Sequence, residues 1–193
     1  MREVIDPRKC YRGIMPIPLL VTLVSYNDSK RDNLTTVSFA GQVSEKKVYV
    51  ALRPTRHVCR VFSESLTRSP AVFGINYLYA DQVEIADYCG VASGRDTDKF
   101  KETGLNVGRV NTNTHFNVPL VKESPLSLAC RLEDMHVSGT HAVFFAEVQA
   151  IVKRQGAIPK FLMHETTSYF STDNLPLGPV FEIGKKMVRR GRK

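Results

Sequence analysis

The hydrophobic and polar positions of this 193-residue chain alternate over short segments separated by polar turns, which is typical of β-strands. Three such segments come at short intervals near the start of the chain, with turns at 27–33 and 42–45. With no helical pattern between them, they predict an antiparallel meander and not a parallel α/β sheet. The last two predicted strands flank the Ser138-Gly139 turn and form a hairpin. The predicted strands are residues 18–26, 33–41, 46–53, 70–78, 126–133 and 140–152.

A helix follows the third strand, and its start carries basic residues. A 3.6-residue period over 58–62 predicts this helix, with Thr55 as its N-cap. Arg53, Arg56 and His57 surround that end, where the helix dipole places partial positive charge and cations are usually disfavoured. Basic side chains and a hydroxyl beside free backbone N–H groups are the donors that a phosphate needs. The alternative is that these side chains only point into water, but three basic groups at one N-terminus favour an anion site.

A second short helix is predicted after the strand at 70–78. Asp81 and Glu84 have the spacing of a capping box, which would open a helix over about 82–89. Gly90 would end it. Strands with helices inserted between them, followed by a closing hairpin, predict a mainly β fold: an antiparallel, Greek-key-like barrel whose closure removes the exposed strand edges.

The segment that follows predicts a third helix and then a loop. Asp96 would cap the helix, Phe100 would pack inward and Gly104 would end it. Lys99 on this helix could reach an anion, although the default role of such a lysine is a solvent-exposed charge. Residues 106–117 are polar and predict a loop.

The predicted strand at 33–41 has an unusual distribution of side chains. Because successive strand residues point to opposite faces, one face is small and rich in hydroxyls. Such a face leaves room for a flat ligand that hydroxyls and backbone amides can hold. The alternative is a half-exposed strand in which threonine occupies ordinary β positions. The first face carries Leu34, Thr36, Ser38 and Ala40, and the other carries Thr35, Val37 and Phe39.

The net charge of +8 is concentrated at the C-terminus. Residues 185–193 hold six of the 27 lysines and arginines and no acid, so the rest of the chain has 21 basic and 19 acidic residues. We therefore expect a single domain over 1–184 and a basic tail over 185–193. No apolar run approaches the roughly 20 residues that span a bilayer, and the N-terminus lacks the apolar core of a signal peptide. These features predict a cytoplasmic protein without a membrane segment.

The cysteines and histidines give no metal-binding pattern. The four cysteines form no CxxC pair and are expected to be buried small hydrophobes. His136 and His141 flank the hairpin turn, where solvent-facing or locally bonded histidines are favoured over a metal pair. No metal is expected. The cysteines are Cys10, Cys59, Cys89 and Cys130.

In their order along the chain, several motifs resemble the flavin reductase-like family, whose fold is the FMN-binding split β-barrel, and within it the flavoredoxin-like branch. The resemblance covers about 16–152, with a weaker echo at 168–170 and 181–184. Its most specific part is the Ser-Gly-Arg-Asp-Thr-Asp-Lys-Phe run at 93–100. The other motifs are Pro-x-Pro-x-x-Val at 16–21, Asn-x-x-Thr at 33–36 with Ser38-Phe39, Arg-Pro-Thr at 53–55, and 141–148.

This resemblance implies FMN as cofactor and a homodimer with FMN at or near the dimer interface. Asn33, Thr35, Thr36, Val37, Ser38 and Phe39 would border the flavin ring, with Phe39 as a stacking aromatic. Arg53, Thr55, Arg56 and His57 would hold the phosphate, Ser93 would belong to the cofactor site, and Lys99 would meet the flavin or its phosphate. His141 would lie on the nicotinamide side. No residue is assigned as a general acid or base, because the flavin carries the redox chemistry.

Three functions are consistent with the sequence. The first is an enzyme, an NAD(P)H:flavin oxidoreductase. The second is a flavoredoxin-type FMN electron carrier that exchanges electrons with protein donors or acceptors and has no NAD(P)H activity of its own. The third is a barrel that binds single-stranded nucleic acid through its basic tail. The near-neutral body and the absence of tryptophan make it much less favoured.

Overall fold

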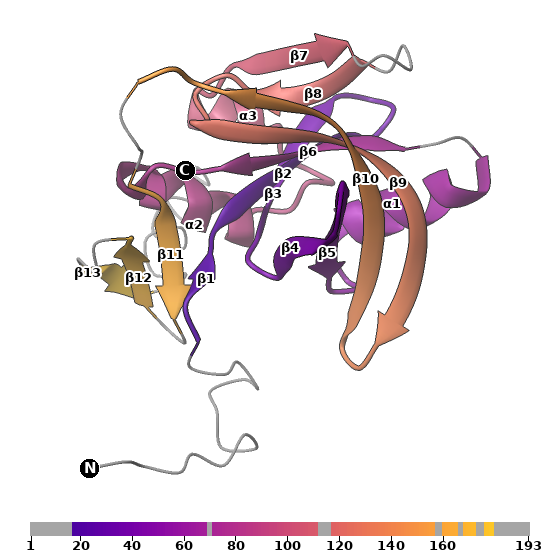
Figure 1. Cartoon of the computed structure of the whole chain (residues 1–193), viewed down its shortest axis with the longest axis horizontal. Coiled ribbons are helices and arrows are strands. Elements are labelled where there is room, and N and C mark those ends of the chain that lie inside the picture. Colours follow the sequence, from indigo (N-terminus) through magenta and orange to yellow (C-terminus); the bar gives the residue numbers. More distant parts are fainter. Residues whose placement is uncertain are drawn as a thin grey trace.

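The computed structural model describes residues 17–68, 71–111, 117–156, 160–165, 168–172 and 176–179. Its largest sheet has seven antiparallel strands in the order β3-β2-β6-β9-β10-β5-β4 (Figure 1). The mainly β fold with short inserted helices is therefore confirmed. The strands are β2 (Thr22–Asn27), β3 (Asp32–Val37), β4 (Ala40–Ser44), β5 (Lys47–Leu52), β6 (Val72–Tyr77), β9 (Leu126–Ser138) and β10 (His141–Lys153).

The predicted meander is wrong in one respect, because the segment 33–41 is not one strand. It bends at Ser38 and Phe39, so that β3 pairs with β2, whereas β4 pairs with β5. The strand β4 also continues to Ser44, and the turn that was expected at 42–45 lies at Glu45 and Lys46. Consecutive strands β3 and β4 thus occupy the two ends of the sheet order, and hydrogen bonding does not close the barrel.

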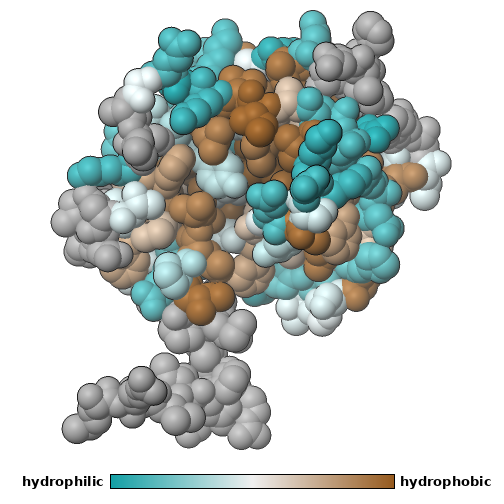
Figure 2. Space-filling model, in the orientation of Figure 1, coloured by the Kyte–Doolittle hydropathy of each residue, from teal (hydrophilic) through white to brown (hydrophobic). Residues whose placement is uncertain are grey.

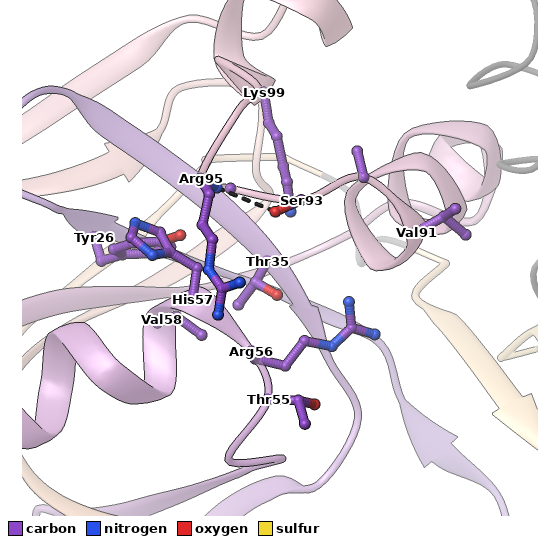
Figure 3. A pocket seen from close by; sticks show the side chains of 12 residues that line it. Tyr26, Thr35, Thr55, Arg56, His57, Val58, Val91, Ser93, Arg95 and Lys99 are labelled. Carbon is purple, nitrogen blue, oxygen red and sulfur yellow. Dashed lines mark hydrogen bonds between the residues drawn. The ribbon is translucent and has the colours of Figure 1, made fainter.

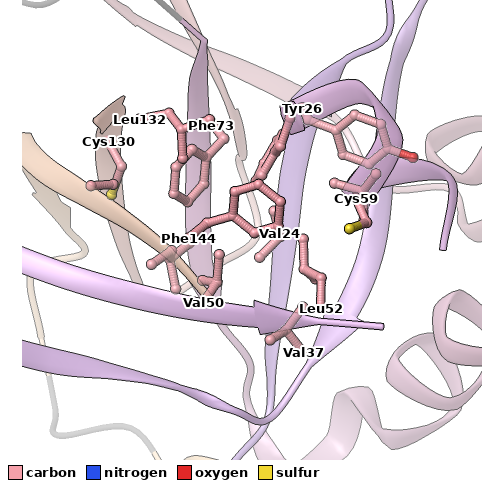
Figure 4. Close-up of a cluster of buried hydrophobic side chains, with 14 of the residues drawn as sticks. Val24, Tyr26, Val37, Val50, Leu52, Cys59, Phe73, Cys130, Leu132 and Phe144 are labelled. Atoms are coloured by element: carbon pink, nitrogen blue, oxygen red, sulfur yellow. The ribbon is translucent and has the colours of Figure 1, made fainter. Parts of the chain in front are cut away.

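The sheet nevertheless wraps around one core, as a split β-barrel does. Val37 from one end of the strand order and Val50 from near the other belong to the same buried cluster (Figure 4). The helix α1 (His57–Arg68) contributes Phe62, whose ring centroid lies 4.9 Å from that of Phe73 and 5.5 Å from that of Phe144. Because burial of one such side chain contributes about 1.5–3 kcal/mol, this cluster fixes α1 and the residues before it.

A second core lies between β3 and the next helix. The short helix η3 (Ala80–Gln82) and α2 (Val83–Val91) follow β6, and Leu34 packs with Ala86 and Cys89. The same cluster includes Tyr169, whose hydroxyl donates to the buried Asp87 carboxylate at 2.9 Å. A small sheet joins this core, in the order β1-β11-β12-β13. Its strands are β1 (Leu19–Leu20), β11 (Leu162–Glu165), β12 (Ser168–Ser171) and β13 (Pro176–Pro179).

The second helix starts close to the predicted residue 82, but its expected cap and its expected end are wrong. The side chain of Gln82 accepts a hydrogen bond from the backbone N–H of Tyr79. The capping contact therefore joins residues 79 and 82, two positions before the predicted pair of Asp81 and Glu84. The helix begins at Val83 and continues through Gly90 to Val91. Gly90 is buried within the helix and does not end it.

The third helix, α3 (Lys99–Thr103), begins two residues later than its predicted cap implies. Asp98 is the N-cap, and its carboxylate accepts from the backbone N–H of Lys101 at 3.1 Å. As expected, Phe100 is buried and Gly104 ends the helix in the left-handed conformation, with φ of 70°.

The two candidate caps of α3 allow a direct test. The Asp98→Ala variant is expected to lose about 1 kcal/mol of unfolding free energy, because a backbone donor loses its partner. The Asp96→Ala variant is the matched control and should change stability by less than about 0.5 kcal/mol. Urea denaturation measures both, and equal losses would contradict the assignment of Asp98.

The predicted loop at 106–117 is wrong for residues 107–111, which form a strand, and residues 112–116 lie outside the described residues. The strand β7 (Val107–Asn111) pairs with β8 (Asn117–Val121). This pair of strands packs on the sheet through Leu120, close to Gly74. A Cβ on Gly74 would lie 2.4 Å from the Ser25 hydroxyl and 2.6 Å from the Leu120 side chain. Glycine there is what permits this close approach.

The long hairpin of β9 and β10 is confirmed, with its turn at Gly139 and Thr140. Cys59, Cys89 and Cys130 are buried as expected. Cys10, the weaker echo at 181–184 and the tail at 185–193 lie outside the described residues. No helix in the described ranges is long and apolar enough to cross a membrane.

Candidate functional site

A pocket of about 190 Å³ opens where the start of α1 meets the segment that follows α2. Six residues that the sequence predicted as cofactor-binding line it, although they come from four separate parts of the chain. The lining residues are Tyr26, Thr35, Thr55, Arg56, His57, Val58, Val91, Ala92, Ser93, Gly94, Arg95 and Lys99 (Figure 3).

The turn between β5 and α1 presents the first group of these residues. The backbone N–H of Arg56 donates to the carbonyl of Arg53 at 2.9 Å, and α1 begins at His57. Thr55 therefore lies within this turn and is not the N-cap, which corrects the prediction. The first turn of α1 contains no acidic residue. Its free backbone N–H groups and partial positive charge are thus left uncompensated by the helix itself.

The pocket is strongly cationic. Arg56 approaches from the side of α1, and Arg95 and Lys99 approach from the opposite segment (Figure 3). Neither aspartate nor glutamate is among its lining residues. Burial, and then the nearby charge of Arg53, lower the pKa of Arg56. Such a collection of like charges is stabilised when an anion binds between them.

Lys99 is the most buried of the three cations, with 2% of its surface exposed. The alternative of a solvent-exposed charge is therefore wrong, because α3 turns its first residue toward α2. The ammonium group donates to the carbonyl of Cys89 at 2.7 Å. Burial lowers the pKa of Lys99 to about 8, with a smaller contribution from Arg56 in the same direction.

Residues 93–98 form a loop between α2 and α3, and one buried side chain holds this loop to β3. The side-chain amide of Asn33 donates to the carbonyls of Gly94 at 3.0 Å and Thr97 at 2.9 Å. A Cβ on Gly94 would lie 2.6 Å from the Tyr26 hydroxyl, so glycine lets the loop approach β2. Asn33 itself does not line the pocket.

His57 is held in place by an acid on the loop between β2 and β3. Its Nε2 lies 3.2 Å from Oδ2 of Asp28, and both side chains are at least nine-tenths buried. Burial alone would raise the pKa of Asp28, but hydrogen bonds from the backbone of Arg31 and from His57 lower it. The Asp28 carboxylate is therefore paired with His57 and lies outside the pocket lining.

A second group of predicted residues lies together beside the pocket. The ring centroids of Phe39 and His141 are 5.3 Å apart in a T-shaped contact. Partial burial, and then the charge of Arg53, lower the pKa of His141, which places Arg53 near the same ring. The resemblance assigned a different role to each of these three residues. Phe39 was expected to be a stacking aromatic, Arg53 a phosphate ligand and His141 a residue on the nicotinamide side.

The remaining predicted residues of β3 turn elsewhere. Thr36 donates to the carbonyl of Ala86 on α2, Val37 packs in the barrel core, and Ser38 lies in the bend. The prediction that one face of this strand is open to a ligand is wrong, because α2 covers Leu34 and Thr36 on that face. Thr35, on the opposite face, is the β3 residue that lines the pocket.

Sequence reasoning missed Tyr26 and Arg95 as lining residues. Arg95 stands inside the 93–100 run that carried the family resemblance, so that run could have indicated it. Tyr26 gave no signal, because an aromatic residue in an apolar strand predicts core packing. Its ring does contact Phe62 in the core, at a centroid distance of 6.2 Å.

The two histidines near the hairpin turn have local partners, as favoured from the sequence. His136 contacts Asp134 at 3.0 Å, and Nδ1 of His141 lies 2.9 Å from the Thr140 hydroxyl. Within the described ranges, no group of three or more His, Cys, Asp or Glu side chains could hold a metal ion.

Known proteins resemble this chain in family and fold. The family model of the flavin reductase like domain matches residues 14–173. The flavoredoxin of Desulfovibrio vulgaris (Miyazaki F) has a TM-score of 0.71 at 22% identity, covering 95% of this chain and 100% of its own. The FMN-binding protein of Thermus thermophilus with bound p-hydroxybenzaldehyde has a TM-score of 0.70 at 18% identity, covering 94% of this chain and 98% of its own.

An enzyme is also among the structures with this fold. The NADH:FAD oxidoreductase of Streptomyces globisporus C-1027 has a TM-score of 0.66 at 19% identity, covering 88% of this chain and 96% of its own. A comparison with curated protein sequences gave no match. At these identities the structural likenesses show the fold, and the family match rests on the sequence.

Proposed function

Because the chain belongs to the flavin reductase-like family, we propose that it binds FMN and acts as an NAD(P)H:flavin oxidoreductase. The observation that carries this proposal is the pocket at the start of α1, with three cationic side chains and no acid among its lining residues. A phosphate monoester is mostly dianionic at neutral pH, and Arg56, Arg95 and Lys99 match that charge.

The donors of the pocket fit the phosphate end of FMN. Arg56 and Arg95 each present a planar fork of N–H donors, and Lys99 presents an ammonium group. Thr35 and Thr55 add hydroxyl donors, which completes a set without any competing carboxylate. Riboflavin lacks the phosphate and would lose the charge-assisted hydrogen bonds to these groups.

The size of the pocket implies that it encloses only one end of FMN. Its volume of about 190 Å³ is below the roughly 300–1,000 Å³ typical of sites that enclose a whole small molecule. The ring end would extend toward Phe39, Arg53 and His141. FMN would supply hydride and electron transfer when bound, and Phe39, Arg53 and His141 would orient its ring.

We further propose a homodimer, in which a second copy of the chain covers the open side of the site. Figure 2 shows hydrophobic side chains gathered along the middle of the face in view, with hydrophilic regions around them. The exposed large hydrophobic residues include Leu20, Ile151 and Val152. Light scattering should give twice the 21.7 kDa of one chain, and a monomer in the FMN-bound state would contradict the dimer.

The first test is the absorption spectrum of the purified protein, followed by titration with FMN. Oxidised flavin bands that remain after desalting would support FMN binding. A colourless protein that also fails to quench added FMN fluorescence would overturn the proposal.

The second candidate function is a flavoredoxin-type FMN electron carrier, which the fold shared with the Desulfovibrio flavoredoxin favours. Anaerobic addition of NADH and, separately, NADPH distinguishes the two. Bleaching of bound FMN within seconds would support the oxidoreductase. FMN that stays oxidised with both nucleotides but is reduced by dithionite would support the carrier, with a protein as electron donor.

A further inference from the structure

We propose that Asn33 determines how strongly the pocket prefers a ligand with a phosphate end, by holding the loop at 93–98 and without touching the ligand. This inference rests on the proposed FMN binding and assigns Asn33 a positioning role. The resemblance had instead placed Asn33 along the flavin ring.

The side chain of Asn33 has no hydrogen-bonding capacity to spare for a ligand. It is 0% exposed, and its two N–H donors bond the carbonyls of Gly94 and Thr97. Its Oδ1 accepts from the backbone N–H groups of Leu34 at 2.9 Å and Lys99 at 3.4 Å. Both donors and the acceptor are therefore used inside the protein.

The loop at 93–98 has its own internal turn, but that turn does not fix where the loop lies. The carbonyl of Ser93 accepts from the N–H groups of Asp96 at 3.3 Å and Thr97 at 3.1 Å. These bonds set the shape of the loop. Two bonds from the side-chain amide of Asn33 then join it to β3, and the N–H of Lys99, directly after the loop, donates to Asn33 Oδ1. One exposed bond from Arg31 to the carbonyl of Arg95 at 3.2 Å adds to them.

The position of this loop decides whether the cations face one another. Arg95 comes from the loop and Lys99 follows it directly, whereas Arg56 comes from the turn before α1. An anion gains most when donors from both sides reach it at once, because charge-assisted hydrogen bonds weaken steeply with distance and angle. If the loop at 93–98 were held less firmly, the phosphate end of the ligand would bind more weakly, while binding of the rest of the ligand would not change.

The chain offers a closely matched control. Asn76 is also 0% exposed, and its amide donates to the carbonyl of Leu23 and the hydroxyl of Ser25. Its Oδ1 accepts from Val121 N–H and from the hydroxyl of Ser127. It thus forms as many buried hydrogen bonds as Asn33, but none of them reaches the loop at 93–98.

The experiment compares the affinities for FMN and riboflavin in Asn33→Ala, Asn33→Ser, Asn76→Ala and Asn76→Ser, by quenching of flavin fluorescence. These substitutions add no charge, so they leave the electrostatics of the pocket unchanged. We expect Asn33→Ala to weaken FMN binding about 10- to 100-fold and riboflavin binding by less than about threefold. Asn33→Ser, which keeps one donor, should give a smaller change in the same direction.

The Asn76 variants should lower the melting temperature but keep the wild-type ratio of the two affinities. Faster hydrogen exchange at residues 94–99 in Asn33→Ser would locate the effect in the loop. An unchanged ratio in both Asn33 variants, or an equal change in the Asn76 variants, would overturn the proposal. A wild-type protein that does not bind FMN would instead overturn the proposed function, so the two failures are distinguishable.

Discussion

The Arg56→Ala variant is expected to bind FMN about 100-fold more weakly than the wild type, while its affinity for riboflavin stays within about threefold. Arg56 lines the pocket beside the start of α1, whose first turn contains no acidic residue. A charge-assisted hydrogen bond contributes about 1.5–3 kcal/mol, and loss of a bidentate contact corresponds to roughly this change in affinity. Isothermal titration calorimetry with both ligands measures it.

A matched control for Arg56 lies on the same helix. Arg60 is exposed and forms an ion pair with Glu64 at 3.6 Å, away from the pocket. Arg60→Ala should leave both affinities within about twofold, since exposed pairs contribute little. Arg56→Lys should recover part of the FMN affinity, because it keeps the charge but not the planar fork. Equal losses for FMN and riboflavin in Arg56→Ala would contradict a phosphate contact.

The Lys99→Met variant is expected to be more stable than the wild type at pH 7, by about 2 kcal/mol. Burial lowers the pKa of Lys99 to about 8 from 10.5, which corresponds to a cost of about 3 kcal/mol for the charged form. Methionine removes that cost but leaves the carbonyl of Cys89 without its donor, which costs about 1 kcal/mol. Urea denaturation at pH 7 measures the difference.

The pH dependence of this stabilisation follows from the direction of the shift. The folded state releases its proton at about pH 8 and the unfolded state at about 10.5, so the unfolded state holds more protons between them. The wild type therefore gains stability as pH rises from about 8 to about 10.5, and the advantage of Lys99→Met is lost over that window. Lys101→Met, on the exposed side of α3, is the control and should show no such trend.

Ligand binding should reverse the cost of the buried ammonium group. Bound phosphate favours the charged form of Lys99, so FMN affinity should fall as pH rises above about 8 in the wild type. The Lys99→Met variant should bind FMN more weakly and show a flat profile there. The second ionisation of the phosphate lies near pH 6 and does not contribute in this range. A wild-type affinity that is constant between pH 7 and pH 9.5 would contradict a contact between Lys99 and the phosphate.

The sequence predicted best those parts of the site that are close together along the chain. Thr55, Arg56 and His57 reach one pocket because three consecutive residues at a helix start cannot lie far apart. The position of the loop at 93–98 could not be predicted from residues that are neighbours in the sequence. Arg95 and Tyr26 are separated by 69 residues, and the contact between Gly94 and Tyr26 depends on how α2 packs against β3.

By itself, the sequence determined the family, the long hairpin and the places of the three helices. Alternation of hydrophobic and polar residues marks the hairpin of β9 and β10, because each such strand buries one of its faces. The tertiary structure alone decided which face of β3 is covered, that 107–111 pairs with 117–121, and that Lys99 is buried while Asn33 holds a loop. Each of these depends on packing between segments distant in sequence, and a polar side chain gives the same pattern whether it points to water, to a ligand or to a buried carbonyl.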